Sequence, residues 1–179
     1  ELANSFGNLA QRTLSQVFKN CDGYLPEISR HTPEDSELLE LVGQASATTI
    51  PECFDRLEIS QGIEHWMAAI FACNQYIDAQ APWTLRKTDP ARMQTVLATL
   101  YIAIAQLAVA IRPVIPASAD RLLDAMGIAP ELRGYAAIQS HWYSPLAEAG
   151  FQLEQPVGVF PRLELPAAWS TFIETNVGG

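Results

Sequence analysis

The segment from Thr88 to Ile111 constrains the fold more than any other part of the chain. Thr88-Asp89-Pro90 has the composition of a helix start, with a capping side chain and a proline suited to the first turn. Apolar residues then recur every three or four positions, and the stretch from Ala103 onward is apolar almost all round. Because a helix without a polar face must be covered on every side, we expect it at the centre of a bundle.

A second helix is expected from Pro33 onward. Thr32 can cap it, proline fits its first position, and the acids Glu34 and Asp35 face the positive end of the helix dipole. Its expected buried stripe includes Leu41.

Three more segments have helical spacing, and together they predict an all-α bundle of about five helices with short connections. Ser60 is the expected cap of the third helix, which ends before Pro82 because proline disfavours helical geometry in the residue before it. Gly127 is the expected C-terminal cap of the last helix. The remaining helices are expected at residues 2–18, 60–81 and 117–126. An extended segment is expected at 155–162. Residues 1–164 form one expected domain, and residues 165–179 form a tail.

The charge of the chain argues against a broad nucleic-acid-binding surface. The chain has twenty acidic and eleven basic residues, which gives a formal net charge of −9. Its only lysines are Lys19 and Lys87. General attraction to phosphates needs an excess of positive charge. If this chain binds RNA, we expect it to use a small local site that reads unstacked bases.

Other classes of protein are also disfavoured. No run of eighteen apolar residues is uninterrupted, so no membrane span is expected. Cys21, Cys53 and Cys73 are widely spaced and fit reduced cytosolic thiols better than disulfides or a zinc site, which predicts a cytoplasmic protein. The first residue is not methionine and no signal peptide follows, so we expect a piece of a longer chain.

No arrangement of residues predicts catalysis in this chain. A Gly-rich phosphate loop, a nucleophile elbow and an HExxH motif are all missing from the sequence. His31, His65 and His141 are scattered, and we expect surface or structural roles for them. The sequence therefore predicts no catalytic residue, no metal site and no cofactor within these 179 residues.

Trp83 is the most informative single residue, because it follows a helix-terminating proline and precedes Arg86 and Lys87. An exposed indole at a helix end can stack on a base, which contributes about 1–3 kcal/mol. The alternative is an indole that folds back and plugs the end of the bundle. The sequence pattern leaves both possibilities open.

Asn8 and Arg12 are four residues apart, so they share one face of the first helix. An amide offers both a donor and an acceptor, and a guanidinium offers a planar fork, so the pair can read base edges. An exposed Asn and Arg on a helix are more often simply solvated.

Four segments, in this order and at plausible spacing, resemble the anticodon-binding domain of methionyl-tRNA synthetases. The most distinctive is the Ala-Pro-Trp triplet with its flanks. The resemblance covers residues 1–164 and rests on Gly7-Asn8-Leu9-Ala10-Gln11-Arg12, on Asn74 to Lys87, on Ile111 to Pro116 and on Val159 to Glu164.

The resemblance implies a role for each candidate residue. In the family the Trp of the triplet stacks on an anticodon base and the Pro shapes the site, which corresponds here to Trp83 and Pro82. The Asn and Arg of the first helix contact anticodon bases, which corresponds to Asn8 and Arg12. The expected RNA-binding residues are therefore Asn8, Arg12, Pro82 and Trp83, with Arg86 and Lys87 as RNA-backbone contacts.

The resemblance also implies partners. The expected RNA is the methionine tRNA with its CAU anticodon, and a catalytic domain of the same parent chain would use ATP with magnesium and methionine. The HIGH-type and KMSKS-type motifs of that domain are missing here, so this chain alone should be inactive. Two alternatives remain: the equivalent domain of a related class I synthetase, and a helical protein-interaction module with a large exposed apolar groove.

Overall fold

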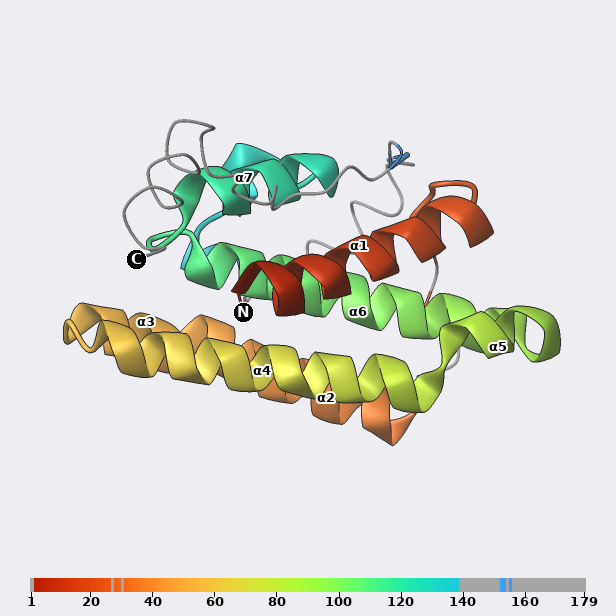
Figure 1. Ribbon diagram of the computed structural model, residues 1–179, viewed down its shortest axis with the longest axis horizontal. Helices are drawn as coiled ribbons and strands as arrows, with labels where there is room; N and C mark the ends of the chain where they lie inside the picture. Colours follow the sequence, from red (N-terminus) through yellow and green to blue (C-terminus); the bar gives the residue numbers. More distant parts are fainter. Residues whose placement is uncertain (1, 27, 30, 139–151, 154, 156–179) are drawn as a thin grey trace, which may run out of the picture.

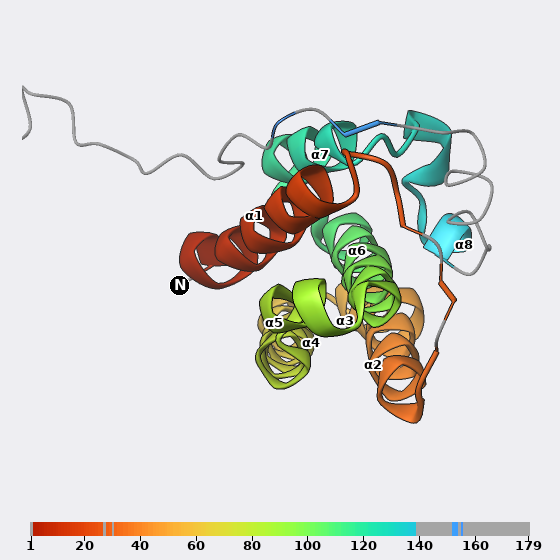
Figure 2. The same ribbon diagram turned by 90° about the vertical axis from the view of Figure 1, so that its right-hand side faces the viewer.

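Helix α6 (Pro90–Ile111) runs through the middle of the protein, as predicted from its apolar surface. In this computed structural model, which describes residues 2–26, 28–29, 31–138, 152, 153 and 155, α6 is buried along nearly its whole length. Figure 2 looks along the long axis and shows α6 between α1 and α7 on one side and α2 and α4 on the other. The neighbours of α6 include α1 (Leu2–Asn20), α2 (Pro33–Gln44), α4 (Ile59–Gln80), α5 (Pro82–Thr88) and α7 (Pro116–Ala125).

The described residues confirm the all-α class, since outside the helices they form only an isolated bridge between Tyr24 and Gln152. Thr32, Asp89 and Gly127 take the predicted positions at helix ends, Gly127 with a φ of +69°. Aromatic contacts join three helices in the core: the Trp66 indole packs edge-on against Phe6 at 5.0 Å and donates a hydrogen bond of 2.9 Å to the Leu107 carbonyl oxygen.

Several elements differ from the prediction. Helix α4 begins at Ile59 after Glu58, without a side-chain cap, so Ser60 as the cap was wrong. Leu41 is exposed, because the buried stripe of α2 is narrow and consists of Leu38 and Val42 with Asp35. Apolar periodicity did not predict the short elements, since they hold too few apolar positions. These elements are a π-helical turn at Ala45–Thr49, α3 (Ile50–Asp55), α5, a 3₁₀ turn at Pro130–Leu132 and α8 (Tyr135–Ile138).

The predicted extended segment at 155–162 and the tail at 165–179 lie almost wholly outside the described residues, so the domain limits stay predictions. Among the described helices, α6 alone is long and apolar enough to cross a membrane, but 83% of its most apolar window is buried within the protein. That burial is typical of a core helix, so its length and composition are weak evidence for a membrane span.

Candidate nucleic-acid interface

The sharp corner between α4 and α5 positions the tryptophan singled out in the sequence. Ala81 joins the two helices in the left-handed conformation, with φ +44° and ψ +60°. For a residue other than glycine this conformation costs about 1–2 kcal/mol. Hydrogen bonds hold the corner nevertheless: the Ala81 N–H donates to Ile77, and the Ala81 oxygen accepts from both the backbone and the hydroxyl of Thr84.

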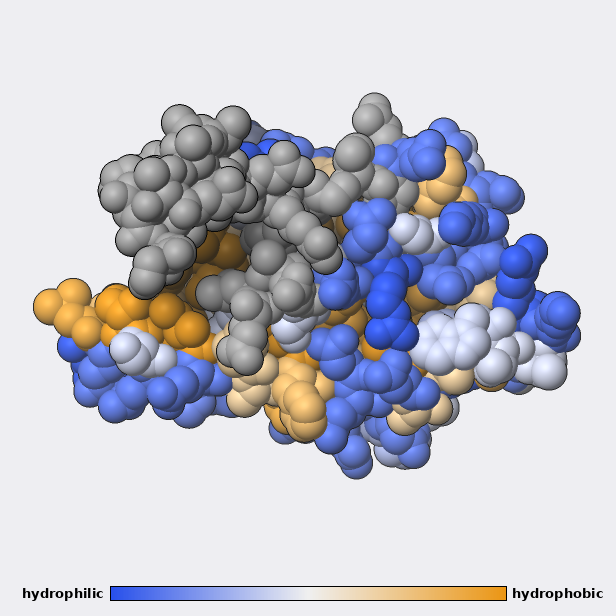
Figure 3. Space-filling model, in the orientation of Figure 1, coloured by the Kyte–Doolittle hydropathy of each residue, from blue (hydrophilic) through white to orange (hydrophobic). Residues whose placement is uncertain are grey.

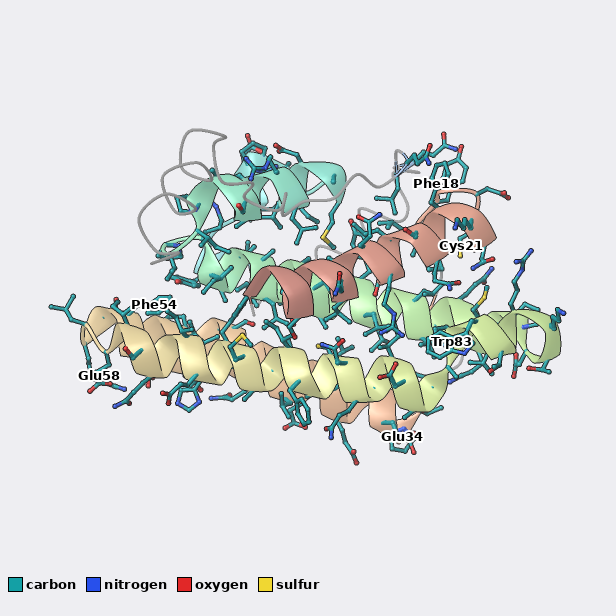
Figure 4. The ribbon with its side chains drawn as sticks, viewed as in Figure 1. Phe18, Cys21, Glu34, Phe54, Glu58 and Trp83 are labelled. Atoms are coloured by element: carbon teal, nitrogen blue, oxygen red, sulfur yellow. The ribbon has the colours of Figure 1, made fainter. Side chains whose placement is uncertain are left out.

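Pro82 and Trp83 are neighbours at this corner but differ in burial. Pro82 is buried at the first position of α5, whereas Trp83 is 42% exposed. Figure 4 shows Trp83 where α5 leaves the end of α4. The possibility that the indole plugs the bundle end is therefore wrong, because a large part of the side chain is exposed to solvent.

Three helices contribute to the surroundings of Trp83. The Arg12 guanidinium carbon, from α1, lies 5.4 Å from the centroid of the indole. The same guanidinium donates a hydrogen bond of 3.0 Å to the carboxylate of Asp78, from α4. We therefore define the indole cluster as Trp83, Arg12 and Asp78.

Asp78 is not among the site residues predicted from the sequence. The signal that it belongs to a site is its position near the end of α4, five residues before Trp83 of α5. That signal becomes visible only once α1 is known to lie alongside α4 and to bring Arg12 to it.

The other predicted residues flank the indole cluster. Asn8 is exposed one turn before Arg12 on the same face of α1. Arg86 and Lys87 are exposed in the last turn of α5, three and four residues after Trp83 and hence on its side of the helix. Among the described residues, no side-chain hydrogen bond or ion pair joins Asn8, Arg86 or Lys87 to the indole cluster.

The surface around α5 is mainly hydrophilic, as Figure 3 shows, whereas apolar residues gather at the far end of α4. The exposed apolar residues at that far end include Leu57 and Ile59. The part of the chain that the structure describes holds no group of three His, Cys, Asp or Glu residues able to bind a metal. His31 and His65 are exposed, His31 beside the Ser36 hydroxyl, and His141 lies outside the described residues.

A buried polar network lies directly behind this surface. Asp35, which is fully buried, accepts two hydrogen bonds from the Arg92 guanidinium, one from the Tyr76 hydroxyl and one from the Thr32 backbone. Burial alone would raise the pKa of the Asp35 carboxyl, but these hydrogen bonds hold that pKa at about 2. Asp35 is therefore a buried carboxylate anion paired with the arginine.

Comparisons with known proteins point to one family. Residues 25–168 match the family described as the anticodon binding domain of methionyl tRNA ligase, a range that includes Pro82 and Trp83. The methionine–tRNA ligase of Mesorhizobium japonicum is 39% identical over 173 residues, which make up 94% of this chain and 32% of that protein.

Two crystal structures of Mycobacterium tuberculosis methionyl-tRNA synthetase are similar to this chain. The apo form has a TM-score of 0.83 at 36% identity, and the match covers 92% of this chain and 33% of that one. The form bound by methionyl-adenylate has a TM-score of 0.81 at 35% identity, covering 89% and 31%. The chain thus spans about a third of the length of these relatives.

Proposed function

The chain belongs to the anticodon-binding domains of methionyl-tRNA ligases, and on this premise we propose that it binds methionine tRNA through the CAU anticodon. Trp83 stacks on an anticodon base, Pro82 fixes the direction of the corner, and Asn8 and Arg12 contact base edges. Arg86 and Lys87 contact the RNA backbone. A parent chain that also holds a catalytic domain would then attach methionine to this tRNA, using ATP with magnesium.

The observation that carries the proposal is the geometry of the indole cluster. A half-exposed indole lies at the corner between α4 and α5, with a guanidinium beside it and two cations on its own short helix. Recognition of unstacked bases requires aromatic rings for stacking and a few guanidinium groups that can bond to base edges. A local site of this kind is compatible with a net charge of −9, which a broad phosphate-binding surface is not.

The two alternatives are now less favoured. The relatives reported above are methionyl-tRNA ligases rather than other class I synthetases. A protein-interaction module would need a large apolar groove, but the surface around α5 is mainly hydrophilic. We therefore keep tRNA binding as the proposed function.

The experiment that tests this function measures binding of the 179-residue chain to a short RNA hairpin with a CAU loop, against a hairpin with the first anticodon base changed. We expect selective binding of the CAU loop, with Trp83→Ala weakening it by about 1–3 kcal/mol, roughly tenfold to a hundredfold. Loss of fluorescence quenching in Trp83→Phe would assign the signal to this indole rather than to the other three tryptophans.

Ile59→Ala is the matched control. Ile59 is 43% exposed, about the same as Trp83 at 42%, but it begins α4, about 30 Å from the corner. Its loss should leave RNA binding unchanged. Equal binding of the CAU and altered hairpins, or no effect of Trp83→Ala, would refute the proposed site.

A further inference from the structure

Arg92 is bonded to the residues on both sides of α5. Its side chain donates a hydrogen bond of 2.8 Å to the amide oxygen of Gln80, the last residue of α4. Its backbone N–H donates one of 3.1 Å to the carboxylate of Asp89, the N-cap of α6. Arg92 therefore forms hydrogen bonds to both ends of the nine-residue stretch between the end of α4 and the start of α6.

Arg92 is itself immobilised by the buried network. Asp35 of α2 binds its guanidinium with both carboxylate oxygens, and Tyr76 of α4 donates to the same carboxylate. Asp35 is held from its own helix too, because the Thr32 N–H donates to it at 2.8 Å. Bidentate pairs of this kind restrict direction as well as distance.

Helix α5 needs such external support. It has seven residues, and an isolated helix that short is unstable in water. Pro82 is its only buried residue, with Leu85 partly buried against the core. Few side chains of α5 therefore anchor it to the core, whereas its exposed side carries Trp83, Arg86 and Lys87.

We propose that Arg92, held by Asp35, clamps α5 and is a positioning residue for RNA recognition. The clamp fixes Trp83 in the orientation that stacks on a base, so that RNA binding need not order the corner. Arg92 touches no RNA in this arrangement and acts through Gln80 and Asp89. The effect on RNA rests on the proposed function, whereas the effect on α5 does not.

Gln80→Ala tests the clamp with the smallest disturbance, because it removes one link and leaves the buried pair of Arg92 and Asp35 intact. In the 179-residue chain we expect faster hydrogen exchange at the amides of α5, with little change in Tm. The Kd for the CAU hairpin should rise about three- to tenfold, the usual effect of one lost hydrogen bond. Gln80→Glu keeps an acceptor for Arg92 and should restore the slow exchange.

Asp120→Asn is the control for a general loss of stability. Asp120 lies on α7 and pairs with Arg112 and Arg133, and both ribbon views place α7 away from α5. This variant should lower Tm without changing exchange in α5 or the Kd for the hairpin. A rise in Kd that followed Tm across both variants would reduce Arg92 to a structural residue and overturn the proposal.

The two hypotheses fail differently. If the wild-type chain does not select the CAU hairpin, the proposed function is wrong, and exchange in α5 still decides whether the clamp exists. If Gln80→Ala leaves both α5 exchange and the Kd at wild-type values, the clamp is wrong, and selective binding by the wild type would still stand.

Discussion

Two arginine–aspartate pairs lie close to the same corner, and they differ mainly in their contact with water. The pair of Arg12 and Asp78 has side chains 44% and 64% exposed, joined by one hydrogen bond of 3.0 Å. The pair of Arg92 and Asp35 has side chains 11% and 0% exposed and is joined by two hydrogen bonds.

Solvent gives the two pairs different roles. An exposed pair contributes at most about 1 kcal/mol, so a ligand can replace either partner at small cost. A buried pair has lost its hydration, so removal of one partner leaves a charge that water cannot reach. On the proposed function, we therefore expect the exposed arginine to be available to RNA and the buried one to serve as a fixed support.

The largest expected effect comes from breaking the buried pair. Asp35→Ala leaves the Arg92 guanidinium buried without its anion, and we expect the free energy of unfolding to fall by about 3–5 kcal/mol. Urea denaturation followed by circular dichroism measures this loss. Asp78→Ala is the matched control, with an expected loss below about 1 kcal/mol. Similar losses in the two variants would contradict the distinction between the pairs.

The second largest effect is expected from acid, which weakens the buried pair by protonating Asp35. The pKa of Asp35 is about 2 in the folded protein, below its ordinary value of 3.8, so its ionised form stabilises the fold. This contribution is complete above about pH 4 and is lost as the pH falls toward 2. The shift corresponds to about 2 kcal/mol.

Comparison with Asp35→Asn isolates this contribution, because the amide does not titrate. The wild type should lose its stability advantage over Asp35→Asn as the pH falls from 5 to 2, measured by denaturation at each pH. A constant difference over that range would mean that Asp35 is not the responsible carboxylate. Asp120, whose pKa is also lowered by Arg112, acts in the same direction in both proteins and therefore cancels.

Local sequence patterns predicted the central helix and several helix ends, although not the start of α4. The N-cap positions of Thr32 and Asp89, the positive φ at Gly127 and the burial of α6 each depend on residues only a few positions apart. The exposure of Trp83 could not be decided in this way, because it depends on how Pro82 packs against the core.

The buried pair could not be predicted at all. Asp35 has a sufficient local explanation as an acid in the first turn of α2, and its partner Arg92 is 57 residues away. No pattern within one helix shows that α2, α4 and α6 converge on one carboxylate. The same limit applies to Arg12 and Asp78, which are 66 residues apart.

The smallest expected effect comes from changing the exposed pair. Asp78→Asn removes a negative charge beside Arg12 and Trp83, which frees the guanidinium and weakens repulsion of phosphates. We expect the CAU hairpin to bind about two- to fivefold more tightly at low salt, which corresponds to about 0.4–1 kcal/mol. The gain should shrink as salt is added, because the pair is open to solvent.

Glu64→Gln controls for the net charge, since Glu64 is an exposed acid on the same helix but nearer its start. Its effect on binding should be smaller than that of Asp78→Asn, because only Asp78 contacts Arg12. If Asp78→Asn instead weakens binding, the exposed carboxylate orients Arg12 for the RNA. Both arginine–aspartate pairs would then hold a residue in position for RNA binding, and the difference in their exposure to water would not predict different roles.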